Sequence, residues 1–248
     1  MSDNWDSYFC NVNDALSSIF VDLGICATAP DPLRPHLLWI WVPMRAARDD
    51  GLSSSAEAPT LSEMEDELTA ALERACDAVL TGRITGAGRR EFYFYGRDAD
   101  GFVEAARSVF AKFEEYAPEA GEQLDAEWSQ YLGLLYPSPR QLQQMSNRRV
   151  IEALVKHNDV LTTPRPITHW IYFANARDRD EVAADLVREG FQSSWTDNPG
   201  PEEQPFGLRL ERHDRAEQDA LDAAVFQILD ALEGRDASYD GWESPVVE

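Results

Sequence analysis

The chain has 248 residues, which is long enough for two domains that each bury a hydrophobic core of their own. It holds 22 Lys and Arg against 45 Asp and Glu, and the resulting net charge of −23 repels nucleic acid and anionic membranes while favouring basic partners. The sequence contains no apolar run of membrane-spanning length and no signal peptide, so we expect a cytoplasmic protein that binds neither nucleic acid nor membrane.

The first predicted elements are strands. The aromatic-rich runs 5–10 and 16–23 flank a run of turn-forming residues at 11–14, and this pattern predicts a β-hairpin. The continuous apolar run 37–42 is typical of a buried strand, which we expect at the core of the first domain.

A helix and a second hairpin follow. Thr60 and Glu63 have the spacing of a capping box, in which side-chain oxygens accept the unpaired N–H groups of the first helical turn, so a helix is predicted to start there. The segments 79–85 and 91–95 flank Gly86-Ala87-Gly88, whose glycines tolerate the positive φ of a tight turn. The sequence therefore predicts a hairpin over this region.

Arginines make this hairpin the most basic spot on an acidic chain. Arg83, Arg89 and Arg90 are candidate anion contacts, and the simpler interpretation is a solvated hairpin tip. The Gly-x-Gly of the turn lacks the Gly-Lys-Ser/Thr of a phosphate loop and leads into a strand. No nucleotide site is expected here.

The first domain closes near residue 137. Apolar residues at helical spacing predict a helix from Phe102, and the aromatic-rich run 128–136 is interpreted as the closing strand. Residues 1–137 are thus expected to form a mixed α+β domain, with a ferredoxin-like fold left open as its form. Ser138 and Pro139 suit the first positions of a helix, which predicts a linker helix within 138–160.

The second domain, residues 161–248, alternates strands and helices. Strands are predicted at 167–173, 191–196, 206–212 and 239–242, and helices are predicted to begin at capping boxes formed by Asp178 with Glu181 and by Asp214 with Glu217. The order strand, helix, strand, strand, helix, strand is that of a ferredoxin-like α+β fold, in which two helices cover one face of an antiparallel sheet.

The other face of that sheet is the candidate binding surface. Side chains alternate along a strand, so Ile171 and Phe173 facing the helices would place Trp170 and Tyr172 on the open face. These aromatic residues either pack against a loop or the other domain, or form a contact surface for a partner.

No pattern in the sequence indicates catalysis. The four histidines have no partner at metal-ligand spacing, and the three widely spaced cysteines include no Cys-x-x-Cys pair. We therefore expect a non-catalytic protein without metal or cofactor.

The second domain resembles a known family. The segment 169–173, the predicted helices and above all Tyr239-Asp240-Gly241-Trp242 are similar to the regulator of ribonuclease E activity, B type (RraB), an acidic bacterial protein family. The first domain, through 5–10, 92–96 and 128–139, is similar to a family of unknown function found fused to such regulators. The resemblance implies an inhibitor that binds ribonuclease E, with Tyr239, Asp240 and Trp242 joining Trp170 and Tyr172 as candidate partner contacts.

Two functional hypotheses follow. The favoured one is a regulatory module whose acidic surface binds a basic protein, ribonuclease E or another. The alternative is a small-molecule sensor or an unrecognised enzyme that uses a cleft between the domains, a common place for ligand sites.

Overall fold

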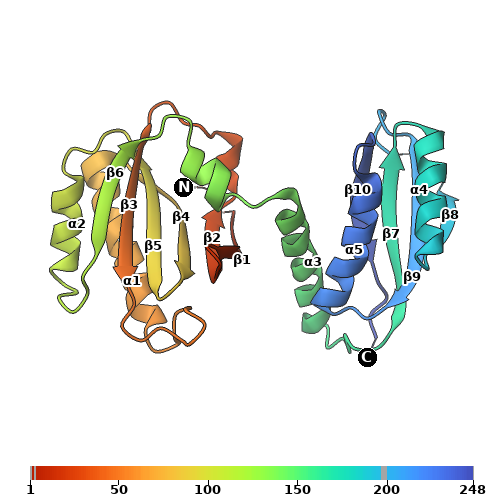
Figure 1. Cartoon of the computed structure of the whole chain (residues 1–248), viewed down its shortest axis with the longest axis horizontal. Helices are drawn as coiled ribbons and strands as arrows, with labels where there is room; N and C mark the ends of the chain where they lie inside the picture. The colour runs from red at the N-terminus through yellow and green to blue at the C-terminus, as the bar shows by residue number, and fades with distance from the viewer. Residues whose placement is uncertain (1, 3, 197–199, 248) are drawn as a thin grey trace. The chain divides into compact units, whose positions relative to one another are not determined.

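The computed structural model describes residues 2, 4–196 and 200–247. The chain forms two compact units, Met1–Ser138 and Pro139–Glu248, and each combines helices with an antiparallel sheet (Figure 1). The mixed α+β fold class and the two-domain arrangement predicted from the sequence are therefore confirmed.

The first unit is built on a six-stranded sheet in the described part of the chain, with the order β1-β2-β4-β5-β3-β6. Both predicted hairpins are present: β1 pairs with β2 and β4 pairs with β5. The turn residues Asn13, Asp14, Ala87 and Gly88 all have positive φ, as two-residue hairpin turns require. The strands are Trp5–Val12 (β1), Ala15–Asp22 (β2), His36–Pro43 (β3), Val79–Gly86 (β4), Arg89–Gly96 (β5) and Glu119–Leu124 (β6).

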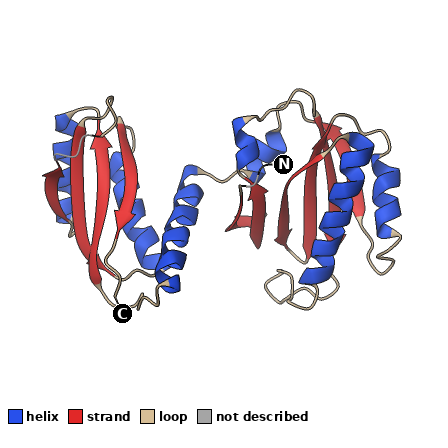
Figure 2. Cartoon of the chain, turned by 180° about the vertical axis from the view of Figure 1, so that it is seen from behind, coloured by secondary structure: helices blue, strands red, loops and turns tan. Residues whose placement is uncertain are grey.

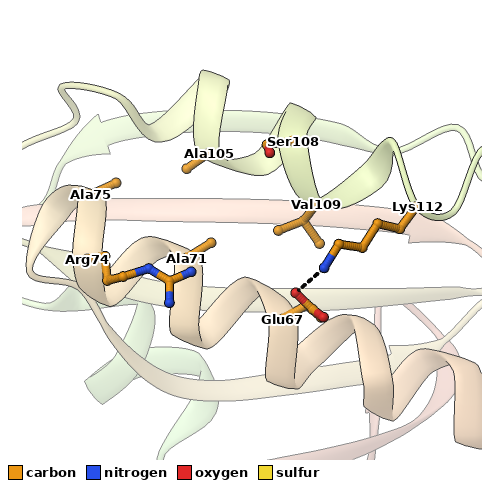
Figure 3. Close-up of a pocket in the computed structure, with 8 residues that line it drawn as sticks. All are labelled: Glu67, Ala71, Arg74, Ala75, Ala105, Ser108, Val109 and Lys112. Atoms are coloured by element: carbon orange, nitrogen blue, oxygen red, sulfur yellow. Dashed lines mark hydrogen bonds and ion pairs between the residues drawn. The ribbon is translucent and has the colours of Figure 1, made fainter.

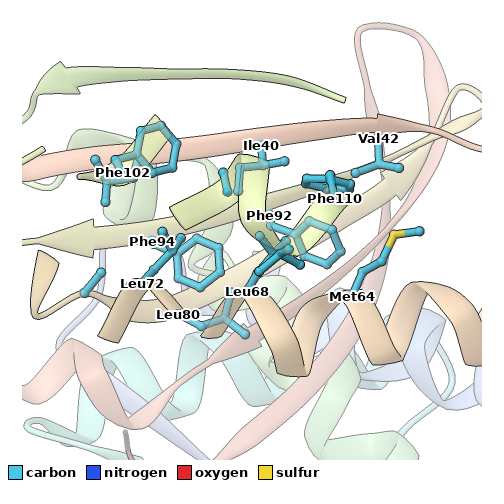
Figure 4. Packing of buried hydrophobic residues seen from close by; sticks show 14 of the residues in the cluster. Ile40, Val42, Met64, Leu68, Leu72, Leu80, Phe92, Phe94, Phe102 and Phe110 are labelled. Carbon is cyan, nitrogen blue, oxygen red and sulfur yellow. The ribbon is translucent and has the colours of Figure 1, made fainter. Parts of the chain in front are cut away.

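Two helices cover one face of this sheet. They are Ala58–Cys76 (α1) and Phe102–Phe110 (α2). Leu61, Met64, Leu68 and Leu72 recur at helical spacing on α1 and are fully buried. Figure 4 shows Met64, Leu68 and Leu72 in one cluster with strand residues such as Phe92 and with Phe102 and Phe110 of α2.

Aromatic residues cover part of the opposite face, and here one prediction is wrong. The run 128–136 is not the closing strand: it forms a turn and the π-helical segment Tyr131–Leu135 (η2). Asp125 accepts the N–H groups of Ser129 and Gln130 at 2.9 and 3.0 Å, and Trp128 stacks on Tyr95 at 4.1 Å. The strand that closes the domain is the polar β6, which pairs with β3.

The second unit contains a four-stranded sheet in its described residues, with the order β10-β7-β9-β8. The helices α4 and α5 connect these strands in the predicted order. Both units contain a β-α-β-β-α-β run with the same order of strands across the sheet. The fourth strand of the run lies next to the first, the first next to the third, and the third next to the second. The elements are Arg165–Phe173 (β7), Ala176–Arg188 (α4), Gln192–Thr196 (β8), Phe206–Asp214 (β9), Gln218–Leu232 (α5) and Ala237–Glu243 (β10).

The helix that follows Ser138 packs within the second unit. It spans Pro139–Lys156 (α3) and lies against α5. Its Ile151 and Leu154 join Ile167 and Leu221 in a buried cluster. The connection predicted as a linker thus contributes to a core.

The three capping boxes predicted the wrong first residue for their helices. Helix α1 begins at Ala58, two residues before Thr60. Helix α4 begins at Ala176, where the side chain of Asn175 accepts the N–H of Asp178 at 2.9 Å. Helix α5 begins at Gln218, whereas Asp214 is the last residue of β9.

Within the described ranges, no helix has the length and apolar character needed to cross a membrane.

Candidate functional site

His169 and Tyr239 form a buried pair in the second unit. The Nδ1 of His169 lies 2.8 Å from the Oη of Tyr239, and His169 is completely buried. Burial, with a further contribution from Arg212, lowers the pKa of His169 to about 3, and burial also raises the pKa of Tyr239. The histidine is therefore neutral at physiological pH, and the pair is a packed core contact.

The tetrapeptide Tyr239-Asp240-Gly241-Trp242 contains a β-bulge. Tyr239 pairs with Ile171 and Gly241 with Trp170, so Asp240 is an extra residue on β10. Gly241 has φ of +127°, a conformation that favours glycine. In a regular strand, residues 239 and 242 would point to opposite faces, but the extra residue turns both rings toward the helix-covered face.

Trp242 is held on that face by hydrogen bonds. Its Nε1 donates to the Oδ1 of Asn147 at 2.9 Å, and the Nδ2 of Asn147 donates to Asp222 at 2.7 Å. Gln218 also donates to Asp222, at 2.9 Å. This network connects β10, α3 and α5, so the tryptophan of the motif fastens α3 to the rest of the unit.

The face of the sheet away from the helices is open in the described residues. Figure 2 shows the strands of the second unit without a helix in front of them. Trp170 is half-buried here, between Arg209 on β9 and Gly241 on β10. Gly241 has no side chain, so its position on β10 places no side chain next to the indole of Trp170. We call Trp170, Ser194, Arg209 and Glu211 the open face.

Tyr172 is on the same face but is buried. A Cβ on Gly200 would lie 2.4 Å from its ring, so the segment before β9 covers it. Of the five predicted contact residues, the structure thus leaves Trp170 partly accessible on the open face and Asp240 exposed on the adjoining edge. Tyr239 and Trp242 lie on the other face.

Carboxylates line the edge of the open face. Strand β10 is an edge strand, and Asp236, Asp240 and Glu243 are exposed on it or next to it. We call these three residues the acidic edge. Arg209, the arginine of the open face, donates to Glu211 at 2.6 Å, so its charge is already compensated.

The three arginines named from the sequence are divided between two faces of the first sheet. Arg89 donates to Glu91 and stacks 4.4 Å above Trp41. Arg83 and Arg90 lie on the face that also carries Phe20 and Phe92, since residues 89 and 90 alternate along β5. Arg83 is paired with Glu65 and stacks on Phe20.

A groove of about 360 Å³ runs between α1 and α2 (Figure 3). It exists because alanines, among them Ala71, Ala75 and Ala105, leave space between the helices. At one end Lys112 forms an ion pair with Glu67 at 2.8 Å, so these two charges neutralise each other. We assign no binding role to this groove.

The sequence reasoning missed Asn147 and Trp195. Asn147 is completely buried although it is polar, and only its contacts across the fold reveal its role. Trp195 on β8 has 57% of its surface exposed, and Arg179 lies 4.4 Å above its ring. A tryptophan in an edge strand was the available signal, but the sequence does not show which strand is an edge.

In the described residues, no group of three or more His, Cys, Asp or Glu side chains is placed to hold a metal ion.

Comparison with known proteins divides the chain at the same place. Residues 3–136 match the model of a family of unknown function (DUF695), and residues 144–244 match the model of the family Regulator of ribonuclease activity B. No curated protein matches the chain. A crystal structure described as an unknown protein from Galdieria sulphuraria aligns with 10% identity over 86% of this chain and 99% of that chain, with a TM-score of 0.23.

Proposed function

The chain belongs to the family of unknown function DUF695 and carries a second domain that matches ribonuclease regulators. We therefore propose that it is a non-catalytic regulator of a ribonuclease. The match over residues 144–244 carries the proposal. We further propose ribonuclease E as the partner, inhibition as the effect and the cytoplasm as the place of action.

The open face and the acidic edge are the proposed contact surface. Trp170 offers a large apolar ring beside a glycine, and aromatic residues of this kind contribute most to protein interfaces. Asp236, Asp240 and Glu243 add negative charge beside the ring, which suits a basic segment of the partner. Regulation follows if this segment is one that the ribonuclease uses to hold RNA or other proteins.

The same carboxylates have a simpler role. Exposed charges on an edge strand prevent other strands from pairing with it, which protects a protein from aggregation. The two roles predict different results for substitutions that remove charge, because only the first makes partner binding depend on these residues.

The direct test is titration of the full chain against the basic scaffold region of ribonuclease E, with RNA cleavage followed in parallel. We expect binding that lowers cleavage and that associates more slowly as salt rises. The reason is that the Debye length falls from about 10 Å at 0.1 M to about 3 Å at 1 M. Absence of binding at low salt, or binding without an effect on cleavage, would contradict the proposed function.

Two pairs of variants locate the surface. Trp170→Ala should increase the dissociation rate about 30-fold, equivalent to about 2 kcal/mol at an interface hot spot. Trp195→Ala, on the opposite face of the same sheet, is the matched control.

The second pair of variants tests the acidic edge. The double variant Asp240→Asn with Glu243→Gln should slow association. The double variant Glu189→Gln with Glu233→Gln is its control, because it removes the same charge elsewhere in the unit. Equal effects within each pair would exclude the open face as the contact surface.

A further inference from the structure

A second pocket with a distinct chemical character lies in the first unit. It has a volume of about 430 Å³ and is lined by three arginines, Arg48, Arg83 and Arg90, together with hydroxyl groups. Strand register explains the grouping, because Ser18 pairs with Thr85 and Thr85 pairs with Arg90 across three neighbouring strands. The loop between β3 and α1 contributes Arg48 and Ser53.

Arg90 is the unusual member of this pocket. Only 5% of its surface is exposed, and its Nε and Nη1 have no hydrogen-bond partner among the described residues. Burial, together with the charge of Arg83, lowers its pKa to about 10, so it still carries a full positive charge at neutral pH. Buried charges in proteins are normally paired.

The neighbouring carboxylates do not supply that pair. Glu57 accepts the N–H groups of Arg45 and Ala46 at 2.7 and 2.8 Å, and the hydroxyl of Tyr116 donates to it at 3.0 Å. Glu65 is paired with Arg83 through Oε1, and its buried Oε2 makes no ion pair with Arg90.

Arg48 is also paired, with Asp50 at 2.6 Å. Of the three arginines at this pocket, Arg90 is thus the one whose Nε and Nη1 make no hydrogen bond to the described residues, and the charges of Glu57 and Glu65 act on it only through space.

We propose that this pocket binds a small organic phosphate, with the phosphate group at Arg90. A guanidinium presents N–H donors in a planar fork that matches two phosphate oxygens. Thr85 is the cross-strand neighbour of Arg90 and Ser18 is that of Thr85, and hydroxyl groups at these two lining positions can donate to the other phosphate oxygens. The organic part lies against Phe9 and Leu52, which also line the pocket. The pocket volume is within the range of small-molecule sites, about 300 to 1,000 Å³.

This site is independent of the proposed ribonuclease contact, since all its residues belong to the first unit. The chain would then join a phosphate-binding domain to a regulatory domain.

Phenyl phosphate is a suitable probe, since it combines one phosphate with one apolar ring. Titrated into the full chain in a calorimeter, it should bind more tightly than inorganic phosphate. It should also raise the unfolding temperature above that in sodium chloride of equal ionic strength, because a ligand that binds the native state stabilises it. Benzoate, with the same ring and a carboxylate, should bind at least tenfold more weakly. Tighter binding of benzoate, or equal stabilisation by chloride, would overturn the phosphate assignment.

Arg90→Met is the decisive variant. It should bind phenyl phosphate at least tenfold more weakly than the parent, because it removes the guanidinium that is proposed to face the phosphate. Arg89→Met, one residue away on the opposite face, should bind within twofold of the parent. If Arg90→Met does not fold, Arg48→Met at the exposed rim should still weaken binding severalfold. Unchanged binding in Arg90→Met, or in Arg48→Met where that variant replaces it, would overturn the proposal.

Discussion

His169 illustrates how burial determines what a titratable side chain contributes. In an accessible site a histidine titrates near neutral pH, but here burial lowers its pKa to about 3. Between pH 6.5 and 3 the unfolded chain therefore binds a proton at this residue that the folded chain does not. The resulting stability is present above about pH 6.5 and is lost as the pH falls.

We expect this loss to be measurable above the range in which carboxylates titrate. Between pH 6.5 and 5, the effect of His169 on the unfolding free energy should steepen toward a loss of about 1.4 kcal/mol per pH unit, as the unfolded histidine becomes fully protonated. Chemical denaturation at pH 7 and pH 5 measures the difference. His169→Gln, which keeps a group able to bond Tyr239, should show a smaller decrease over this interval. An identical decrease in both proteins would mean that the histidine is protonated in the fold.

The capping boxes show why a local motif misleads in this chain. With 45 acidic residues, a Ser, Thr or Asp followed three residues later by Glu arises often without marking a helix start. At α4 the cap is Asn175, whose side chain exchanges hydrogen bonds with Asp178. Apolar residues recur at helical spacing because one face of each helix packs on the core. This periodicity indicates that a helix exists, but it does not indicate where the helix begins.

The misassigned closing strand has a related cause. The run 128–136 is rich in aromatic residues because it packs on the sheet, and burial of this kind does not distinguish a strand from a helical turn. The true strand, β6, is an edge strand with mostly exposed side chains, so it carries no apolar alternation. Pairing with β3 across the sheet determines it, and sequence patterns do not contain that information.

The bulge in β10 depends on one backbone conformation. Gly241 has φ of +127°, which a residue with a Cβ adopts only with strain. We expect Gly241→Ala to reduce the stability of the second unit by about 1–3 kcal/mol, measured by chemical denaturation. Asp240→Ala is the control, because it changes an exposed side chain in the same bulge at a residue without positive φ. Equal stability of both variants would show that the bulge tolerates a side chain.

At the scale of the whole molecule, the sequence was most informative about element order. Both sheets contain the same succession of strands and helices, which the hairpin of β1 and β2 precedes in the first unit, and apolar patterns and turn residues mark nearly all of these elements. Alternation along β7 correctly placed Trp170 on the face away from the helices. Tyr239 and Trp242, which were named through the family resemblance, lie on the helix-covered face because of the bulge in β10. Alternation did not reveal that Gly200, distant in sequence, lies against the ring of Tyr172.

The packing of α3 sets the size of the smallest stable second domain. Residues 139–248 expressed alone should unfold cooperatively, because this fragment keeps the cluster of Ile151, Leu154 and Ile167. A fragment of residues 160–248 lacks α3, which exposes that cluster and leaves Trp242 and Asp222 without Asn147. We expect it to be less stable by several kcal/mol in urea denaturation. Equal stability of the two fragments would mean that α3 contributes nothing to this core.

The bulge at Asp240 also places chain length at this position under selection, in addition to any role of the side chain. Deleting the single residue Asp240 would restore regular alternation and turn Trp242 away from Asn147, whereas replacing its exposed side chain leaves the register intact. During evolution, insertions and deletions between the tyrosine and the tryptophan are therefore expected to be removed, even where the side chain at residue 240 changes. A gap placed there by a sequence aligner would be an alignment error rather than a tolerated change.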